Sequence, residues 1–173
     1  MSGKANRGKK FEKLIDKTNL FYRENRLADI RKVPVPFRIL GYSKGKVTGH
    51  LEVGEFVDYT GVSNGGVAYA LEAKEIKGKS FPLSKLHEHQ FEFLRSWSSY
   101  GARAGLLINF SELEEYYFLP FDLLKDCWEN AKENKGVRGT QSIPIKYMRE
   151  NAIELKVVSG ILDYLIYINE YYE

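Results

Sequence analysis

The chain has 173 residues, of which 43% are hydrophobic, and this is enough apolar material for one folded domain with a buried core. We therefore expect one domain over residues 1–173, and we exclude a wholly disordered chain. Lysine and arginine number 26 against 23 acidic residues, so the net charge of +3 does not identify a partner by itself. The one cysteine, Cys127, excludes an internal disulfide. With no signal peptide and no membrane-spanning apolar run, we expect a cytoplasmic protein that makes no membrane contact.

Positive charge is concentrated toward the start of the chain. Residues 1–32 contain ten lysine or arginine residues and four acidic residues, a local excess of six positive charges. The rest of the chain is slightly acidic. This distribution indicates a surface that binds phosphate groups of a nucleic acid, although a solvated helix face would have the same composition.

The first half of the chain predicts a helix followed by extended segments. Apolar residues at helical spacing predict a helix over residues 6–25. Two prolines favour an extended conformation within residues 27–40. Residues 37–54 then predict a two-stranded hairpin with its tip at Ser43 to Lys46. Because this hairpin carries several basic residues and little apolar alternation, we expect it to project from the body.

The second half predicts further strands and helices. A β-type run at residues 55–62 precedes a strand at residues 67–74. Ser84 could cap the next helix, whose apolar stripe includes one polar residue, Gln90. Two strands, a helix and a final amphipathic segment follow, at residues 104–110, 115–120, 121–132 and 161–172. This order predicts an α/β fold with a mixed central sheet flanked by helices.

Two opposite charges occur on one face of the strand at residues 67–74. A strand has a period of two, so Glu72 and Lys74 share a face with Ala68 and Ala70. Burial of a lone charge costs several kcal/mol, so this pair must be satisfied by each other, by water or by a bound group. An exposed cross-strand ion pair is the simpler alternative. A polar residue on an apolar stripe, such as Gln90, is usually a hydrogen-bonded core amide, but this stripe faces the sheet that carries Glu72 and Lys74.

Asp58 followed by Glu72-x-Lys74 is similar to the metal-dependent nuclease pattern PD-(D/E)xK. Hydrolysis of a phosphodiester needs an activated water and stabilisation of charge on phosphate, and Mg²⁺, with Mn²⁺ as a substitute, assists both. Such a cation prefers oxygen ligands, here Asp58, Glu72 and the main-chain carbonyl of Ala73. Lys74, on the same face, can orient the attacking water and lower its pKa, or stabilise the charge on phosphate. The spacing alone is weak evidence, because it often arises by chance.

The segments around these residues are more specific. "RGKKFEKLIDKTN", "IRKVPVP", "DYTGV", "LEAKEIKGKSFPLSKLHEHQ", "FLPFDLLKDCW" and "QSIP" occur in an order that resembles the RecU-type Holliday junction resolvases, over roughly residues 6–165. The resemblance implies a restriction-endonuclease-like fold and a homodimer that depends on Mg²⁺. It also implies that each subunit nicks one of two opposed strands of a four-way or branched DNA, with residues 37–54 as a protruding stalk. A recombinase or the branch-migration machinery would be a further partner.

The resemblance also assigns residues. Asp58, Glu72 and Lys74 match its catalytic residues, and Gln90 matches the glutamine of its "HxHQ" segment. Glu12 matches an acidic residue of the first helix near the metal site, although a solvated helix acid is an equal alternative. The residues expected to contact DNA are Arg7, Lys9, Lys10, Arg31, Lys32, Arg38, Tyr42, Lys44, Lys46, Lys79, Lys85 and His87.

The chain departs from the family pattern just before Asp58. Glu55 and Phe56 stand where hydroxyl residues are usual, which leaves the details of the metal shell open. His87 and His89 lack a third ligand, so we do not expect zinc. Two other functions stay open: a restriction-type nuclease of the same core that cuts linear duplex, and a non-catalytic DNA-binding or recombinase-modulating protein.

Overall fold

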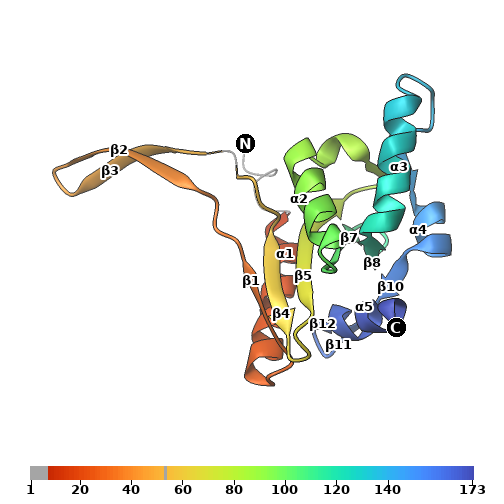
Figure 1. Cartoon of the computed structure of the whole chain (residues 1–173), viewed down its shortest axis with the longest axis horizontal. Coiled ribbons are helices and arrows are strands. Elements are labelled where there is room, and N and C mark those ends of the chain that lie inside the picture. The colour runs from red at the N-terminus through yellow and green to blue at the C-terminus, as the bar shows by residue number, and fades with distance from the viewer. Residues whose placement is uncertain (1–7, 53) are drawn as a thin grey trace.

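The computed structural model describes residues 8–52 and 54–173 (Figure 1). Its helices are α1 (Gly8–Glu24), α2 (Glu88–Ser99), α3 (Phe121–Glu133), α4 (Ile145–Asn151) and α5 (Tyr164–Tyr172), with a 3-10 turn, η1, at Leu83–Lys85. Its strands are β1 (Ala28–Lys32), β2 (Phe37–Ser43), β3 (Lys46–Leu51), β4 (Tyr59–Ser63), β5 (Ala68–Ile76), β6 (Ser80–Pro82), β7 (Arg103–Phe110), β8 (Glu115–Pro120), β9 (Ser142–Pro144), β10 (Ile153–Leu155), β11 (Val157–Val158) and β12 (Ile161–Leu162).

A six-stranded sheet in the order β1-β4-β5-β7-β8-β10 forms the centre of the molecule. Its β5 and β7 are parallel, and all its other neighbours are antiparallel. Two parallel neighbours need a crossover connection, and the segment with α2 supplies it. The mixed α/β fold predicted from the sequence is therefore confirmed.

Each face of the sheet is covered by its own hydrophobic cluster. Helices α2 and α3 pack on one face, where Ala70 and Ile76 of β5 are buried. Helices α1 and α5 belong to the other face, where Tyr69 and Leu71 are buried. Neighbouring residues of β5 thus point to opposite faces, as the period of a strand requires. The middle of β5 is therefore enclosed by protein on both sides.

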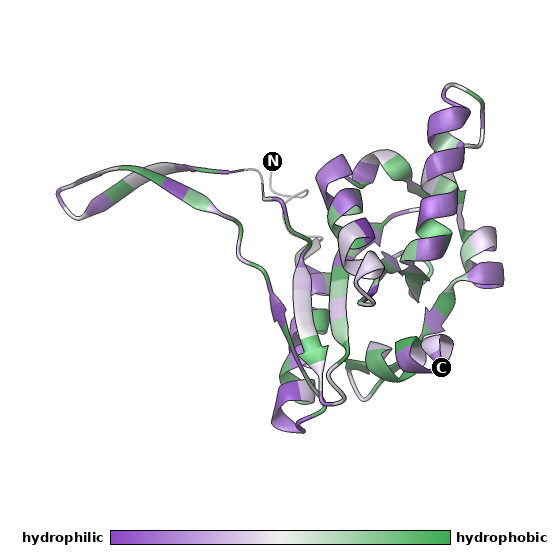
Figure 2. Ribbon diagram, viewed as in Figure 1, coloured by the Kyte–Doolittle hydropathy of each residue, from purple (hydrophilic) through white to green (hydrophobic). Residues whose placement is uncertain are grey.

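Strands β2 and β3 form a separate hairpin that extends away from the body (Figure 1). Lys44 and Gly45 have φ angles of +48° and +74°, as a two-residue turn with positive φ at both positions requires, and the predicted tip is confirmed. The hairpin carries more hydrophobic residues than its sequence pattern suggested, as the green stretches of its ribbon show (Figure 2). Its exposed large hydrophobic residues are Phe37, Ile39, Leu40, Tyr42, Val47 and Leu51.

Some boundaries differ from the prediction. Ser84 lies in η1 and caps no helix, because α2 begins only at Glu88. The cap is His87, whose backbone N–H donates to the side chain of Gln90 in a capping box. Short elements after residue 140, including α4 and β10, were not predicted. Within the described residues, no helix is long and apolar enough to cross a membrane.

Candidate active site

Four polar residues meet where the start of β4 lies beside the second half of β5. Asp58 directly precedes β4, and the pairing of Tyr59 with Leu71 brings it beside Glu72. Glu72 and Lys74 share one face of β5, and Gln90 lies in the first turn of α2 on that face. The sequence-predicted residues Asp58, Glu72, Lys74 and Gln90 are therefore brought together by the fold.

Hydrogen bonds connect these residues into one network. The Asp58 backbone N–H donates to Glu72 Oε2 at 3.1 Å, and the Ala73 N–H donates to Asp58 Oδ2 at 2.9 Å. Lys74 Nζ lies 2.7 Å from Glu72 Oε1. Gln90 bridges that pair, since its Nε2 donates to Glu72 Oε1 at 2.6 Å and its Oε1 accepts from Lys74 Nζ at 3.1 Å. Both oxygens of Glu72 are thus held in fixed directions.

The ion pair of Glu72 and Lys74 is more buried than a surface ion pair, and the pKa of Glu72 is raised. The side chain of Glu72 is 2% exposed and that of Lys74 is 14% exposed, so the alternative of an exposed cross-strand pair is wrong. Burial raises the pKa of Glu72 to about 7, although the charge of Lys74 opposes this rise and the charge of Asp58 adds to it. A further cation near Glu72 would stabilise its carboxylate form.

Oxygen atoms suitable for a hard cation occur together at this point. In an antiparallel pair of strands, a hydrogen-bonded residue uses both its N–H and its carbonyl with the same partner residue. The N–H and the carbonyl of one strand residue therefore point to the same side of the strand. Because the Ala73 N–H points at Asp58, its carbonyl faces that side as well. Residues 8–52 and 54–173 hold no group of three His, Cys, Asp or Glu side chains suited to a metal ion. The carboxylates of Asp58 and Glu72 with the Ala73 carbonyl are nevertheless a fitting set for Mg²⁺.

Glu12 lies to one side of this network. Its Oε2 is 2.5 Å from Lys32 Nζ, so two residues predicted for different roles form an ion pair. Burial alone would lower the pKa of Lys32, but the carboxylates of Glu12, Asp16 and Asp58 raise it overall. Asp16, which the sequence reasoning missed, accepts a hydrogen bond from the Tyr59 hydroxyl at 3.0 Å. Its position four residues after Glu12, on the same helix face, was the available signal.

The residues predicted to contact DNA fall into separate groups. Arg7 and the side chain of Lys9 lie outside the described part of the chain. Arg31 binds both carboxylate oxygens of Asp29, at 2.7 and 3.0 Å. Lys10 is exposed on α1, and Arg38, Tyr42, Lys44 and Lys46 are exposed on the hairpin. Lys79, Lys85 and His87 are exposed between β5 and α2, and the His87 N–H donates to Gln90 of the network.

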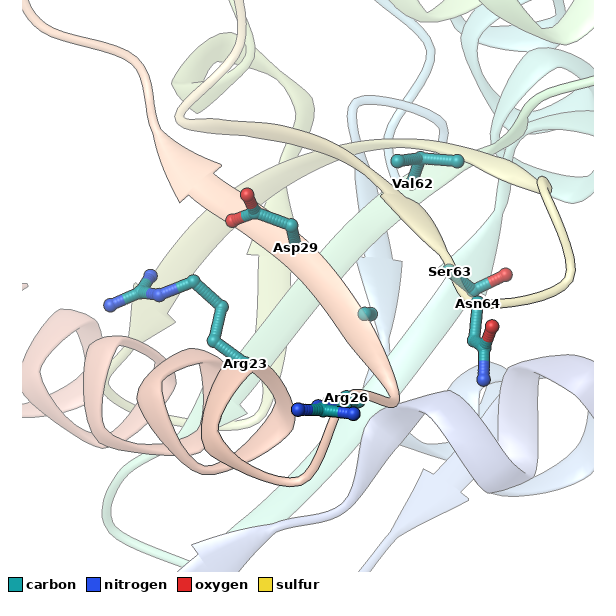
Figure 3. Close-up of a pocket in the computed structure, with 7 residues that line it drawn as sticks. Arg23, Arg26, Asp29, Val62, Ser63 and Asn64 are labelled. Atoms are coloured by element: carbon teal, nitrogen blue, oxygen red, sulfur yellow. The ribbon is translucent and has the colours of Figure 1, made fainter.

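Two hollows mark the ends of β4. Asp58 and Gln90 line one of about 160 Å³, between the hairpin linkers and α2. A larger one of about 370 Å³ lies at the opposite end of β4. There, Arg23 projects from the last turn of α1 and Arg26 from the turn that follows it, while Ser63 and Asn64 lie at the end of β4 (Figure 3). The larger hollow contains none of the predicted catalytic residues.

A comparison with known protein families identifies the family of this chain. The family model described as Recombination protein U matches residues 6–170. The chain belongs to the RecU family. The Holliday junction resolvase RecU of Streptococcus pneumoniae strain CGSP14 is 33% identical over 173 residues, covering 95% of this chain and 82% of that protein. The RecU protein of S. pneumoniae strain G54 is 32% identical with the same coverage.

A solved structure shares the fold of this RecU family member. The structure of Hjc, a Holliday junction resolvase of Archaeoglobus fulgidus, aligns with a TM-score of 0.50 and 14% identity, over 83% of this chain and 94% of that chain. At this identity the likeness shows the fold alone. It confirms the predicted restriction-endonuclease-like arrangement of a mixed sheet flanked by helices.

Proposed function

We propose that this RecU family member is a Holliday junction resolvase that hydrolyses phosphodiester bonds in two opposed strands of a four-way DNA junction. The observation that carries the proposal is the hydrogen-bonded network of Asp58, Glu72 and Lys74, in which Glu72 is buried. The chain that carries this network belongs to the RecU family, and the relatives it resembles are named Holliday junction resolvases. The cytoplasm as its location, and a recombinase or branch-migration protein as a further partner, stay predictions.

We assign the metal site to Asp58, Glu72 and the carbonyl of Ala73. A bound Mg²⁺, or Mn²⁺ in its place, would supply a water of lowered pKa and a positive charge opposite the developing charge on phosphate. The hydrogen bond from the Ala73 N–H fixes Asp58 Oδ2 and so orients that carboxylate. The buried position of Glu72 supports this assignment, because a cation would remove the cost of its charge.

Lys74 and Gln90 have complementary roles in this proposal. The Lys74 ammonium is held between Glu72 and Gln90, and a lysine has three donors. A donor not used by these partners can orient the attacking water or bind a phosphate oxygen. Gln90 keeps the ammonium in place through an oxygen that also accepts from the His87 N–H at 3.1 Å. Gln90 is therefore a positioning residue.

A homodimer follows from the same proposal, because cutting two opposed strands takes two sites related by symmetry. The hairpin supports it independently. A two-stranded hairpin alone is at best marginally stable in water, and this one exposes six large hydrophobic residues. Contact with a second copy would cover that surface. The stalk of residues 37–54 would then lie at the centre of the assembly and select branched DNA by shape.

The test is incubation with an end-labelled four-way junction, with and without Mg²⁺, beside a linear duplex of the same sequence. We expect paired nicks in opposed strands of the junction, only with the metal, and little cleavage of the linear duplex. The Asp58→Asn protein serves as the control for contaminating nucleases. Equal cleavage of both substrates would point to a restriction-type enzyme. Junction binding without any cleavage would establish a non-catalytic DNA-binding protein.

A further inference from the structure

Two segments without acidic residues lie side by side next to the active site. Residues 76–87 contain three lysines, and residues 134–149 contain two lysines and two arginines. The β6–β9 pairing joins them, with Phe81 opposite Ile143. Backbone hydrogen bonds extend the pairing at both ends, from Leu83 N–H to Gln141 O at 3.1 Å and from Ile145 N–H to Lys79 O at 2.9 Å.

The pairing creates a rigid basic surface. Phe81 and Ile143 are 0% and 2% exposed, so they anchor both segments in the core. The basic side chains lie on the outside. We call this the β6–β9 surface, and its exposed basic residues are Lys77, Lys79, Lys85, Lys135 and Arg138. Arg149 and Lys146 are not included, because Arg149 binds Glu115 on β8 and Lys146 Nζ lies 3.8 Å from Glu150 Oε1.

The end of α3 adds to this surface. Lys132 Nζ is 2.7 Å from Glu88 Oε1 at the start of α2, and it lies 5.6 Å from the centre of the Trp128 ring. Ser84, Lys132 and Lys135 line a hollow of about 450 Å³ together with Trp128. Hydroxyl and ammonium donors that line a hollow are suited to phosphate oxygens.

The β6–β9 surface adjoins the active site at η1. The His87 N–H donates to the same Gln90 oxygen that accepts from Lys74, so η1 and the start of α2 adjoin the proposed catalytic lysine. Helix α3 lies on the side of the body away from the hairpin (Figure 1). A DNA arm that leaves the active site opposite the hairpin would therefore cross this surface.

We propose that the β6–β9 surface binds the phosphate backbone of the duplex arm next to the cleaved bond. The inference rests on the proposed function, and it adds Lys135 and Arg138, which the sequence reasoning did not assign. The β6–β9 pairing joins two segments that contain no acidic residue. The positive charges of each segment are therefore not neutralised by an acid of the same segment. Contacts of this kind position the duplex without reading its sequence.

The test uses binding in EDTA, so that it is independent of cleavage. The double variant Lys135→Ala with Arg138→Ala removes two exposed charges from the surface. The matched control, Lys125→Ala with Lys156→Ala, removes two exposed charges that lie outside both residues 1–32 and the β6–β9 surface. We expect the first variant to bind a long-armed junction roughly tenfold or more weakly at moderate salt and to lower the salt slope by at most about two units. The control should bind like wild type.

A series of junctions with different arm lengths distinguishes a DNA contact at the β6–β9 surface from a general effect of the lost charge. Junctions are prepared with arms shortened stepwise, and wild type should lose affinity once the arm no longer reaches the β6–β9 surface. The double variant should show no such step and should equal wild type on the shortest arms. The same loss at every arm length, no loss at all, or an equal loss in the control would overturn the proposal. A failure of wild type to cut junctions with Mg²⁺ would instead count against the proposed function.

Discussion

The burial of Glu72 makes a quantitative prediction about stability and pH. In the metal-free protein its pKa is about 7, raised mainly by burial from an ordinary value of 4.5. A carboxyl with a raised pKa keeps its proton in the folded protein at pH values where the unfolded chain has lost it. Its contribution to stability is therefore complete below about pH 4.5 and declines as the pH rises through about 7. Glu72→Gln removes this titration and keeps nearly the same shape.

The magnitude follows from the size of the shift. One pKa unit corresponds to about 1.4 kcal/mol, so the full shift of Glu72 is worth about 3 kcal/mol between low and high pH. The Gln variant also loses contacts with Lys74, which adds an offset of its own. We therefore compare the unfolding free energies of wild type and the Glu72→Gln protein at each pH. The informative quantity is how this difference changes with pH. Relative to the variant, wild type should lose about 2 to 3 kcal/mol from about pH 5 to about pH 8.

Urea unfolding in EDTA, at equal protein concentration across the pH series, measures this difference. A difference that does not change with pH, or that changes in favour of wild type as the pH rises, would refute the assignment of Glu72 as a buried carboxylate of raised pKa. Mg²⁺ provides a second check on the same samples. It should stabilise wild type at high pH and leave the Glu72→Gln protein almost unchanged, because the variant lacks one proposed ligand charge.

Further predictions concern cleavage and binding. Asp58→Asn should abolish cleavage with junction binding largely intact, and nick formation near the wild-type rate would show that the metal site is wrongly assigned. Lys74→Ala should slow cleavage about 10²–10⁴-fold in single-turnover assays, and recovery by lower salt alone would make it an ordinary phosphate contact. Gln90→Ala should slow cleavage at unchanged junction affinity and cost about 1 kcal/mol of stability through the lost helix cap, so a weaker affinity would contradict a positioning role. A short neutral turn in place of Ser43 to Lys46 should weaken junction binding more than duplex binding in matched isotherms, and equal losses would rule out the hairpin as the source of selectivity.

The parts of the fold with a clear period could be predicted from the sequence. Helix α1 and strand β5 repeat their apolar positions at the spacing of their type, and both lie near the expected bounds. The hairpin tip was predictable because only a few turns connect two strands, and Lys44 with Gly45 suits one of them. The Glu72 and Lys74 pair was also a sound signal, because charges on a half-buried strand need partners.

Other features depend on contacts between distant segments, and local pattern carries no trace of these. Strands β6 and β9 have three residues each, too short for a period, and they form because they pair with one another. Ser84 suggested a helix cap by its chemistry, but the Gln90 side chain reaches back to His87 and moves the start of α2. The ion pair of Glu12 with Lys32 likewise joins two elements whose proximity only the fold sets.

The enclosure of β5 between two hydrophobic clusters has a consequence for how the protein is made. A ribosome synthesises Asp58, Glu72 and Lys74 well before Arg103–Phe110, the parallel neighbour that closes one side of β5. Until β7 and α2 have been made, Glu72 stays in water and Gln90 cannot bridge it to Lys74. The groups that we propose cut DNA are thus assembled only late in synthesis. A chain that stops before α2 and β7 therefore lacks the assembled network.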